Sequence, residues 1–226
     1  MKSLFFILIV FIPQIFLAQQ NDFQAWYSLA TDVKIGDKWT LGVSNEIRTS
    51  CNAQVFEKNH FDLGAEYEIS KKIDAGLFLR YSTEYPTLSE RSNKIEYYGT
   101  LEFGKKFGRI QLAARLRAGS DEDNNHLDGK EWEHRERLKL NYNIKGFPLN
   151  PALSAELFFP AAYNFLDLSK TRILCGFTWK PGKENNHNFS LMYGWQHSFN
   201  TRVPKNDFLL CLEYKFTFRK FQKDKK

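Results

Sequence analysis

The sequence predicts an all-β fold: a closed antiparallel transmembrane β-barrel of the outer-membrane type, with 10–12 strands. Apolar and polar residues alternate with a period of two along most of the chain after residue 22, as in strands that have one apolar face. Many of these segments alternate for about 10 residues, the length that a tilted strand needs to cross a bilayer. Short connections alternate with long polar ones, which is typical of a barrel with short turns on one rim and long loops on the other.

The first residues of the chain differ from the rest. A positively charged start precedes an apolar stretch, Leu4–Leu17, and Ala18 provides a small residue at a cleavage position. The apolar stretch is too short for a membrane helix, so we interpret residues 1–18 as a cleaved secretory signal peptide. We expect residues 19–218 to form the barrel and residues 219–226 to form a basic C-terminal tail.

Eleven segments carry the alternating pattern. In chain order they are residues 23–35, 39–48, 61–69, 73–81, 95–103, 110–116, 138–144, 153–159, 173–179, 189–195 and 210–218. Tight links fall near Gly36 and at residues 70–72, 104–108, 145–150 and 181–187, and longer polar links fall at residues 51–59, 86–93, 120–130, 160–170 and 200–206. Single-chain bacterial barrels have an even number of strands, so we expect 10 or 12 strands. Either two segments merge or one lies outside the wall, which gives 10 strands, or a further strand lies in a loop, which gives 12. The N-terminal segment is the first candidate to lie outside the wall.

The two faces of the segments differ in a way that indicates which side faces the interior. The apolar face carries rings near the segment ends, which are typical of interfacial girdles: Trp39, Phe103, Tyr142, Trp179 and Phe218 toward the short turns, and Tyr85, Trp132, Phe159 and Phe199 toward the long loops. The polar face carries charges that a soluble barrel with an apolar interior would not accept. We single out as lumen-facing Glu66, Arg80, Arg115, Arg117, Glu133, Arg135, Arg137, Lys139, Glu156, Arg172 and Glu213. In a barrel of this size side chains fill much of the interior, so we favour a plug over a selectivity filter.

Composition excludes other classes of protein. Aromatic residues make up 16% of the chain, yet mean hydropathy is −0.49, because the apolar residues are dispersed by alternation. The net charge of +6 is small, and its charges are interleaved, so we expect no nucleic-acid partner. Cys51, Cys175 and Cys211 have no zinc spacing, and strand phase puts the last two on opposite faces. We therefore expect free thiols, no metal and no cofactor.

Two resemblances agree with this interpretation. The last segment, Leu212–Phe218, resembles the C-terminal signal that the outer-membrane assembly machinery recognises, here followed by a short tail. The stretches Asp22–Arg48 and Leu138–Phe159, together with this last segment, resemble an uncharacterised family of outer-membrane barrels, the domain of unknown function 2490. The resemblance implies a barrel in the outer membrane and implies no activity.

The sequence therefore predicts export to the outer membrane of a Gram-negative bacterium, with outer-membrane lipid, lipopolysaccharide and the assembly machinery as partners. We expect no enzymatic activity, and a role that is structural or that of a narrow pore for small polar solutes. One alternative is an outer-membrane lipid hydrolase or acyl-modifying enzyme, with His197, Ser198 and Asn200 as the loosely similar residues. Adjacent strand residues point to opposite faces, which argues against a pair of His197 with Ser198. Another alternative is a soluble periplasmic β-barrel that binds an apolar ligand.

Overall fold

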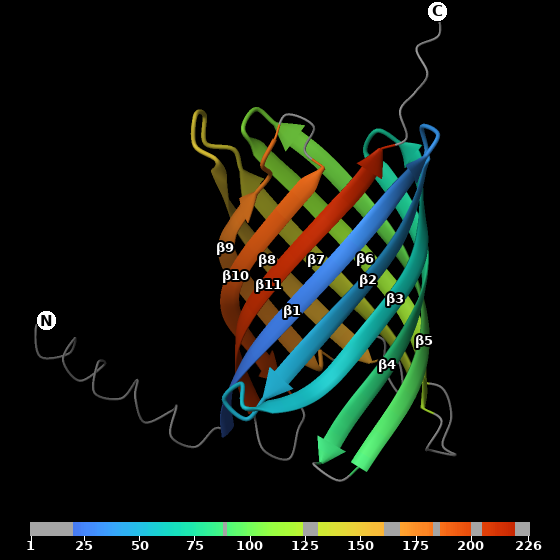
Figure 1. Ribbon diagram of the computed structural model, residues 1–226, viewed down its shortest axis with the longest axis vertical. Coiled ribbons are helices and arrows are strands. Elements are labelled where there is room, and N and C mark those ends of the chain that lie inside the picture. Colours follow the sequence, from blue (N-terminus) through green and yellow to red (C-terminus); the bar gives the residue numbers. More distant parts are fainter. Residues whose placement is uncertain are drawn as a thin grey trace, which may run out of the picture.

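A computed structural model describes residues 20–87, 90–123, 131–160, 168–182, 186–199 and 205–219. Within these residues eleven strands form one closed barrel (Figure 1). They are β1 (Gln20–Ile35), β2 (Trp39–Ser50), β3 (Val55–Ser70), β4 (Ile73–Thr87), β5 (Glu90–Phe107), β6 (Ile110–Asp123), β7 (Glu131–Tyr142), β8 (Leu149–Pro160), β9 (Lys170–Trp179), β10 (His187–Ser198) and β11 (Lys205–Arg219). Ten of the eleven alternating segments of the sequence lie within one of these strands, and the segment 138–144 runs two residues beyond the end of β7. The predicted signal peptide and the tail beyond residue 219 lie outside the described residues.

The barrel is closed by a parallel pair of strands, which we call the seam. Every strand is antiparallel to its chain neighbours, but β1 pairs with β11 in parallel, from Gln20 opposite Lys205 to Lys34 opposite Arg219. The expectation of a wholly antiparallel barrel with an even number of strands is therefore wrong, as is the expectation that the N-terminal segment lies outside the wall. With an odd number, the first and last strands run in the same direction, so a closed barrel requires a parallel seam.

The connections divide the barrel into two rims. The short-turn rim carries the links after β1, β3, β5, β7 and β9, and the long-loop rim carries the links after β2, β4, β6, β8 and β10 (Figure 1). The long links expected at residues 51–59 and 86–93 are mostly strand, because the ladders continue through Lys58 opposite Glu84 and Glu84 opposite Ser92. The link after β2 shortens to a turn in which Cys51, Asn52 and Ala53 have positive φ. Because the ladder between β4 and β5 continues past Glu84, the β4–β5 hairpin extends beyond the rest of the long-loop rim (Figure 1).

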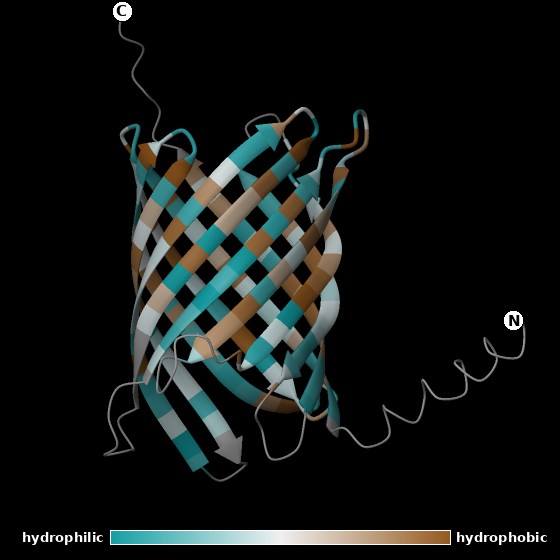
Figure 2. Cartoon of the chain, turned by 180° about the vertical axis from the view of Figure 1, so that it is seen from behind, coloured by the Kyte–Doolittle hydropathy of each residue, from teal (hydrophilic) through white to brown (hydrophobic). Residues whose placement is uncertain are grey.

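Side chains alternate between the outer surface and the lumen. Leu77 is 75% exposed on the outer surface, whereas its chain neighbours Gly76 and Phe78 face inward. Figure 2 shows the resulting alternation of hydrophobic and hydrophilic residues along the strands. The exposed apolar residues include the predicted rings Trp39, Phe103, Trp132, Tyr142, Trp179 and Phe218. The outer surface of the barrel is thus predominantly apolar, and in the described residues no helix is long and apolar enough to cross a membrane.

One carboxylate interrupts this apolar outer surface near the middle of β7. Glu136 is exposed, and its neighbours across the sheet are Leu116 on β6 and Leu157 on β8. The cysteines lie as strand phase predicts: Cys175 is exposed on the outer face, Cys211 is half-buried, and all three thiols are free.

The wall is closely packed where β9 meets β10. A Cβ atom added at Gly176 would lie 2.0 Å from the carbonyl oxygen of Leu191, and one added at Gly194 would lie 1.9 Å from that of Ile173. No larger residue fits at either position unless the backbone moves. These two glycines permit the close approach of the two strands.

The charged lumen as candidate functional site

A continuous row of polar and charged side chains follows the inner wall, with one member on each strand from β3 to β11. In order of strand pairing, its members are Glu68, Asp74, Glu102, Arg115, Arg137, Glu156, Arg172, Gln196 and Asp207. Strands in a barrel are tilted, so paired neighbours are offset along the barrel axis. The row begins near the end of β3 at the short-turn rim and finishes near the start of β11 at the long-loop rim, so it connects the two rims.

The part of this row nearest the long-loop rim is linked by hydrogen bonds and ion pairs. Arg172 contacts the Glu156 carboxylate at 3.0 Å and donates two hydrogen bonds to Gln196 Oε1, at 3.0 and 2.7 Å. Gln196 Nε2 in turn donates to Asp207 at 2.9 Å. Arg115 lies 3.7 Å from Glu156. Glu156 is only 6% exposed, so these partners supply the hydrogen bonds that a buried charge requires.

A second group of charges is paired on the opposite side of the lumen. Arg80 donates to both carboxylate oxygens of Asp62, at 2.6 and 2.8 Å, and lies 3.7 Å from Glu96. Arg117 donates to Glu96 at 3.1 Å. The bidentate Arg80–Asp62 pair is the strongest geometry available to these side chains. Arg135 pairs with Glu133 on its own strand.

Arginines and aromatic rings form a stack that crosses the lumen. Arg48 on β2 lies 3.8 Å from the ring of Trp26 on β1, and Arg172 on β9 lies 4.6 Å from the same ring. Arg172 also lies 4.8 Å from the ring of Phe158 on β8, and Arg135 on β7 lies 4.8 Å from it. In the strand order of the barrel, β2 and β7 lie on opposite sides. The stack therefore spans the interior from one wall to the other.

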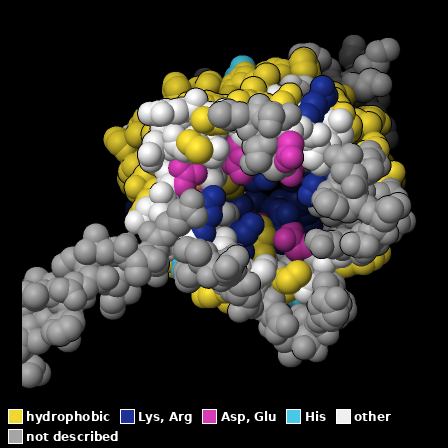
Figure 3. All heavy atoms as spheres, turned by 90° about the horizontal axis from the view of Figure 1, so that it is seen from below, with side chains coloured by type: hydrophobic (Ala, Val, Ile, Leu, Met, Phe, Trp, Pro, Cys, Tyr) yellow, Lys and Arg dark blue, Asp and Glu magenta, His cyan; other side chains and the backbone are white. Residues whose placement is uncertain are grey.

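A further ring extends this stack around the wall. The ring of Tyr98 on β5 lies 3.5 Å from the Arg117 guanidinium and 4.9 Å from the ring of Phe78. Trp26, Tyr98 and Phe158 are 6%, 9% and 2% exposed. We call the three rings and their arginines the arginine–aromatic layer: Trp26, Tyr98, Phe158, Arg48, Arg80, Arg117, Arg135 and Arg172. Seen from the long-loop rim, basic side chains occupy the interior and apolar side chains the periphery (Figure 3).

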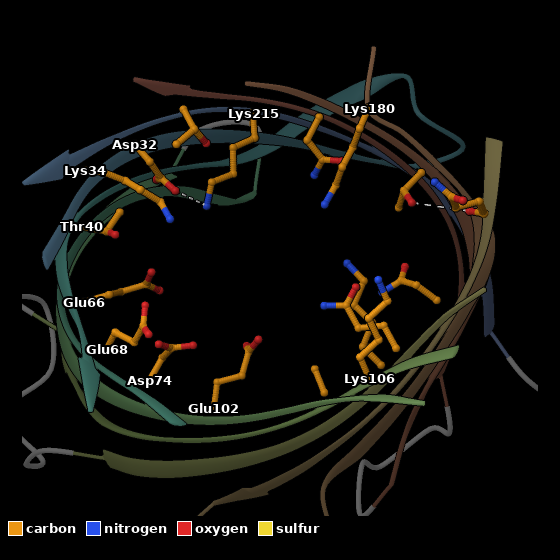
Figure 4. Close-up of a pocket in the computed structure, with 18 of the residues that line it drawn as sticks. Asp32, Lys34, Thr40, Glu66, Glu68, Asp74, Glu102, Lys106, Lys180 and Lys215 are labelled. Carbon is orange, nitrogen blue, oxygen red and sulfur yellow. Dashed lines mark hydrogen bonds and ion pairs between the residues drawn. The ribbon is translucent and has the colours of Figure 1, made fainter. Parts of the chain in front are cut away.

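The short-turn half of the lumen is open. It contains a cavity of about 920 Å³ that we call the vestibule, lined mainly by charged and polar side chains (Figure 4). A deeper cavity of about 460 Å³ reaches toward Arg80, Tyr98 and Arg117. The two cavities share Asp32, Glu66, Asp74, Glu102, Arg137, Lys139 and Lys215 in their linings, so the vestibule continues down to the layer.

The residues singled out from sequence divide between these two regions. Glu66, Arg137 and Lys139 line the vestibule, and Arg115 and Glu213 line its deeper part. Arg80, Arg117, Arg135 and Arg172 belong to the arginine–aromatic layer, where Glu133 and Glu156 pair with two of them. The three rings of the layer were not identified from the sequence, although strand phase was a signal for Trp26. This residue shares a strand face with Gln24 and Ser28, so its position on the polar face placed it inside.

Among the described residues, His197 contacts a different partner from the two residues considered with it for catalysis. His197 Nδ1 lies 2.8 Å from Asn206 Oδ1, which also accepts a hydrogen bond from Trp195 Nε1, and Asn200 lies outside the described residues. A different pair, His60 and Ser82, is in contact at 2.6 Å, but the two residues are 4% and 1% exposed and a substrate has no access to them. Among the described side chains, no group of three or more His, Cys, Asp or Glu is arranged to hold a metal ion.

The fold and the lumen define a class of protein: a closed, mixed, eleven-stranded β-barrel with an apolar outer surface and a charged interior. Comparison with known families gives a match to a family model over residues 23–206, most of the chain. The chain belongs to this family, DUF2490, which is described as a protein of unknown function. Neither the curated proteins nor the solved structures contain a match.

Proposed function

We propose that this protein is an integral barrel of the Gram-negative outer membrane. The distribution of side chains supports the proposal, because apolar residues cover the outside and charges line the inside, the reverse of a soluble barrel that binds an apolar ligand. Exposed rings such as Trp39 at the short-turn rim and Trp132 at the long-loop rim suit the two interfaces of a bilayer. In this setting the outer face contacts lipid and, on one side, lipopolysaccharide.

We propose further that the lumen is closed and that the role of the barrel is structural. The observation that carries this proposal is the stack from Arg48 through Trp26, Arg172 and Phe158 to Arg135, which crosses the interior. Each cation–π contact contributes roughly 0.5–2 kcal/mol, more where water is excluded. The arginines in the stack are also fixed by carboxylates, so opening a path between them requires several interactions to break together.

Conductance in planar bilayers tests the closure. We expect the protein, refolded from detergent, to give no discrete conductance steps. Removing both rings of the stack, Trp26→Ala with Phe158→Ala, leaves the Arg172–Glu156 pair in place and should produce discrete steps. Tyr27→Ala is the matched control, because it removes a ring from the neighbouring position on the outer face and should leave the barrel silent.

Two results would contradict this proposal, one of them the closed lumen itself and the other the role of the stack in closing it. Discrete steps from the unmodified protein, with an ion preference that shifts in Arg137→Glu, would favour the second candidate function, a narrow pore for small polar solutes. The row of charges that connects the two rims is the observation in favour of that pore. A double variant that folds but stays silent would show that the stack is not what closes the lumen. Circular dichroism and heat-modifiable gel mobility establish whether each variant folds.

A further inference from the structure

The charges of the vestibule are arranged differently from those of the arginine–aromatic layer. Each arginine of the layer forms an ion pair with a carboxylate. In the vestibule, four of the carboxylates gather on β3–β5, and basic groups lie opposite these four and beside them (Figure 4). Two more carboxylates, Asp32 and Asp37, lie near the end of β1, where Asp32 pairs with Lys215. The acidic wall consists of Glu66, Glu68, Asp74 and Glu102, and the basic wall of Lys106, Arg109, Arg137, Lys139 and Lys180. The two walls face each other across a cavity of about 920 Å³.

Among the residues that the structure describes, most of these wall charges make no ion pair within 4 Å. Within the described part of the chain, Arg137 and Glu102 form an ion pair at 3.6 Å, but Glu66, Glu68 and Asp74 make no ion pair within 4 Å. The same holds for Lys106, Arg109, Lys139 and Lys180 among those residues. The row of charges even places Asp74 directly between Glu68 and Glu102 on the neighbouring strands.

This arrangement opposes folding. Like charges directly opposite each other on paired strands are destabilising. In the adjacent arginine–aromatic layer, by contrast, the interior charges are paired, as in Arg80 with Asp62 and Arg172 with Glu156. Separated walls of opposite sign create a field directed across the cavity, which favours a molecule with separated charges of its own. A simple anion would be attracted by one wall and repelled by the other, and so would a simple cation.

We infer that the vestibule is a binding site for small zwitterions. The ammonium group of the ligand faces the carboxylates of β3–β5, and its carboxylate or phosphate group faces the basic wall. The volume lies within the range of small-molecule sites, about 300–1,000 Å³, and suits a short linear zwitterion such as a tripeptide. The site depends on the vestibule alone, so it goes beyond the proposed function and requires neither a membrane nor a closed lumen.

Isothermal titration calorimetry with three peptides tests this inference. Triglycine carries both charges, N-acetyl-triglycine carries only the negative one, and triglycine amide carries only the positive one. The protein is used in non-ionic detergent at low ionic strength, because salt screens such interactions. We expect triglycine to bind more tightly than either analogue by at least roughly five-fold, the effect of one partly exposed ion pair.

Variants of the two walls should each remove the preference for triglycine over a different one of its two analogues. Glu66→Gln with Asp74→Asn neutralises part of the acidic wall, so triglycine should bind no better than its N-acetyl analogue. Lys106→Gln with Lys139→Gln neutralises part of the basic wall, so triglycine should bind no better than its amide. Glu136→Gln removes a carboxylate from the outer face and should change none of the three affinities.

Equal affinities of the three peptides for the unmodified protein, or no binding of any of them, would overturn the inference. So would equal shifts in all three affinities in both wall variants, which would indicate an effect of net charge alone. Because these measurements are made in detergent, their outcome is separate from the conductance test of the lumen.

Discussion

Leu77 offers a direct measurement of which solvent surrounds the barrel. It is the central residue of the outward-facing set Ile73, Ala75, Leu77, Leu79 and Tyr81 on β4, and it is 75% exposed. Leu77→Arg therefore removes few contacts with the rest of the protein. Its effect on the free energy of unfolding depends almost entirely on whether lipid or water surrounds the barrel. An arginine facing hydrocarbon at mid-depth costs about 2–4 kcal/mol. The same substitution on a surface in water usually changes stability by less than about 0.5 kcal/mol.

The assay is equilibrium unfolding by guanidinium chloride in lipid vesicles, followed by tryptophan fluorescence. We expect Leu77→Arg to lower the free energy of unfolding by about 2–4 kcal/mol, which is a change of roughly 30- to 1,000-fold in the folding equilibrium. Ile35→Arg is the matched control, because Ile35 is 45% exposed at the end of β1, on the short-turn rim. Near an interface the cost of arginine falls to about 0–1 kcal/mol.

The critical result is the difference in destabilisation between the position at mid-height of the barrel and the position at its rim. If Leu77→Arg and Ile35→Arg have equally small effects, the middle of the outer surface is in contact with water, and the proposal of an integral membrane barrel fails. Equally large effects of both would indicate a packed protein surface over the whole height of the barrel, which would also contradict lipid contact.

Two further substitutions test other features of the wall. Glu136→Leu should raise the free energy of unfolding in vesicles by about 1–3 kcal/mol, because it replaces a carboxylate in the apolar surface with an apolar side chain. An unchanged or lower free energy of unfolding would contradict lipid contact at this position. Gly194→Ala should destabilise the barrel by about 1–3 kcal/mol or more, because its Cβ would lie 1.9 Å from the Ile173 carbonyl oxygen; the control Gly104→Ala, with no atom within 4 Å, should be neutral or stabilising, and equal unfolding curves for the two would refute the close packing of β9 against β10.

The sequence contained enough information to predict the strands and their faces. A period of two identifies a strand and assigns each residue to a face, and each of the eleven segments corresponds to a strand of the barrel, although residues 143 and 144 fall beyond the end of β7. The positions at which the strands end were harder to predict from the sequence. Glu57, Lys58 and Asn59 are polar on both faces, so they look like a loop, yet all three lie in β3, and Lys58 and Asn59 pair with β2 and β4. The pattern of hydrophobicity disappears where a strand leaves the apolar zone, although the ladder continues.

The partners within the lumen were not predictable from the sequence. Alternation shows that Glu156 and Arg172 face inward, but a shift of two residues in pairing leaves both inward while it changes their neighbours. The row from Glu68 to Asp207 depends on the register of eight strand pairs together. The parallel seam was missed for a different reason: the expectation of an even number of strands was taken from other barrels and not from this chain.

The seam has a consequence for how the protein folds. Asn21 and Asn206 meet across it although they are 185 positions apart in the chain. Until β11 arrives, β1 has only β2 beside it, and its other edge exposes backbone groups that can pair with another chain. Contacts between distant parts of a chain form slowly, because the entropy of closing the loop is lost before the contact is made. A nascent chain is therefore vulnerable to aggregation until its last strand is in place, and shielding of the free edge of β1 in that interval would favour correct closure over association with a neighbour.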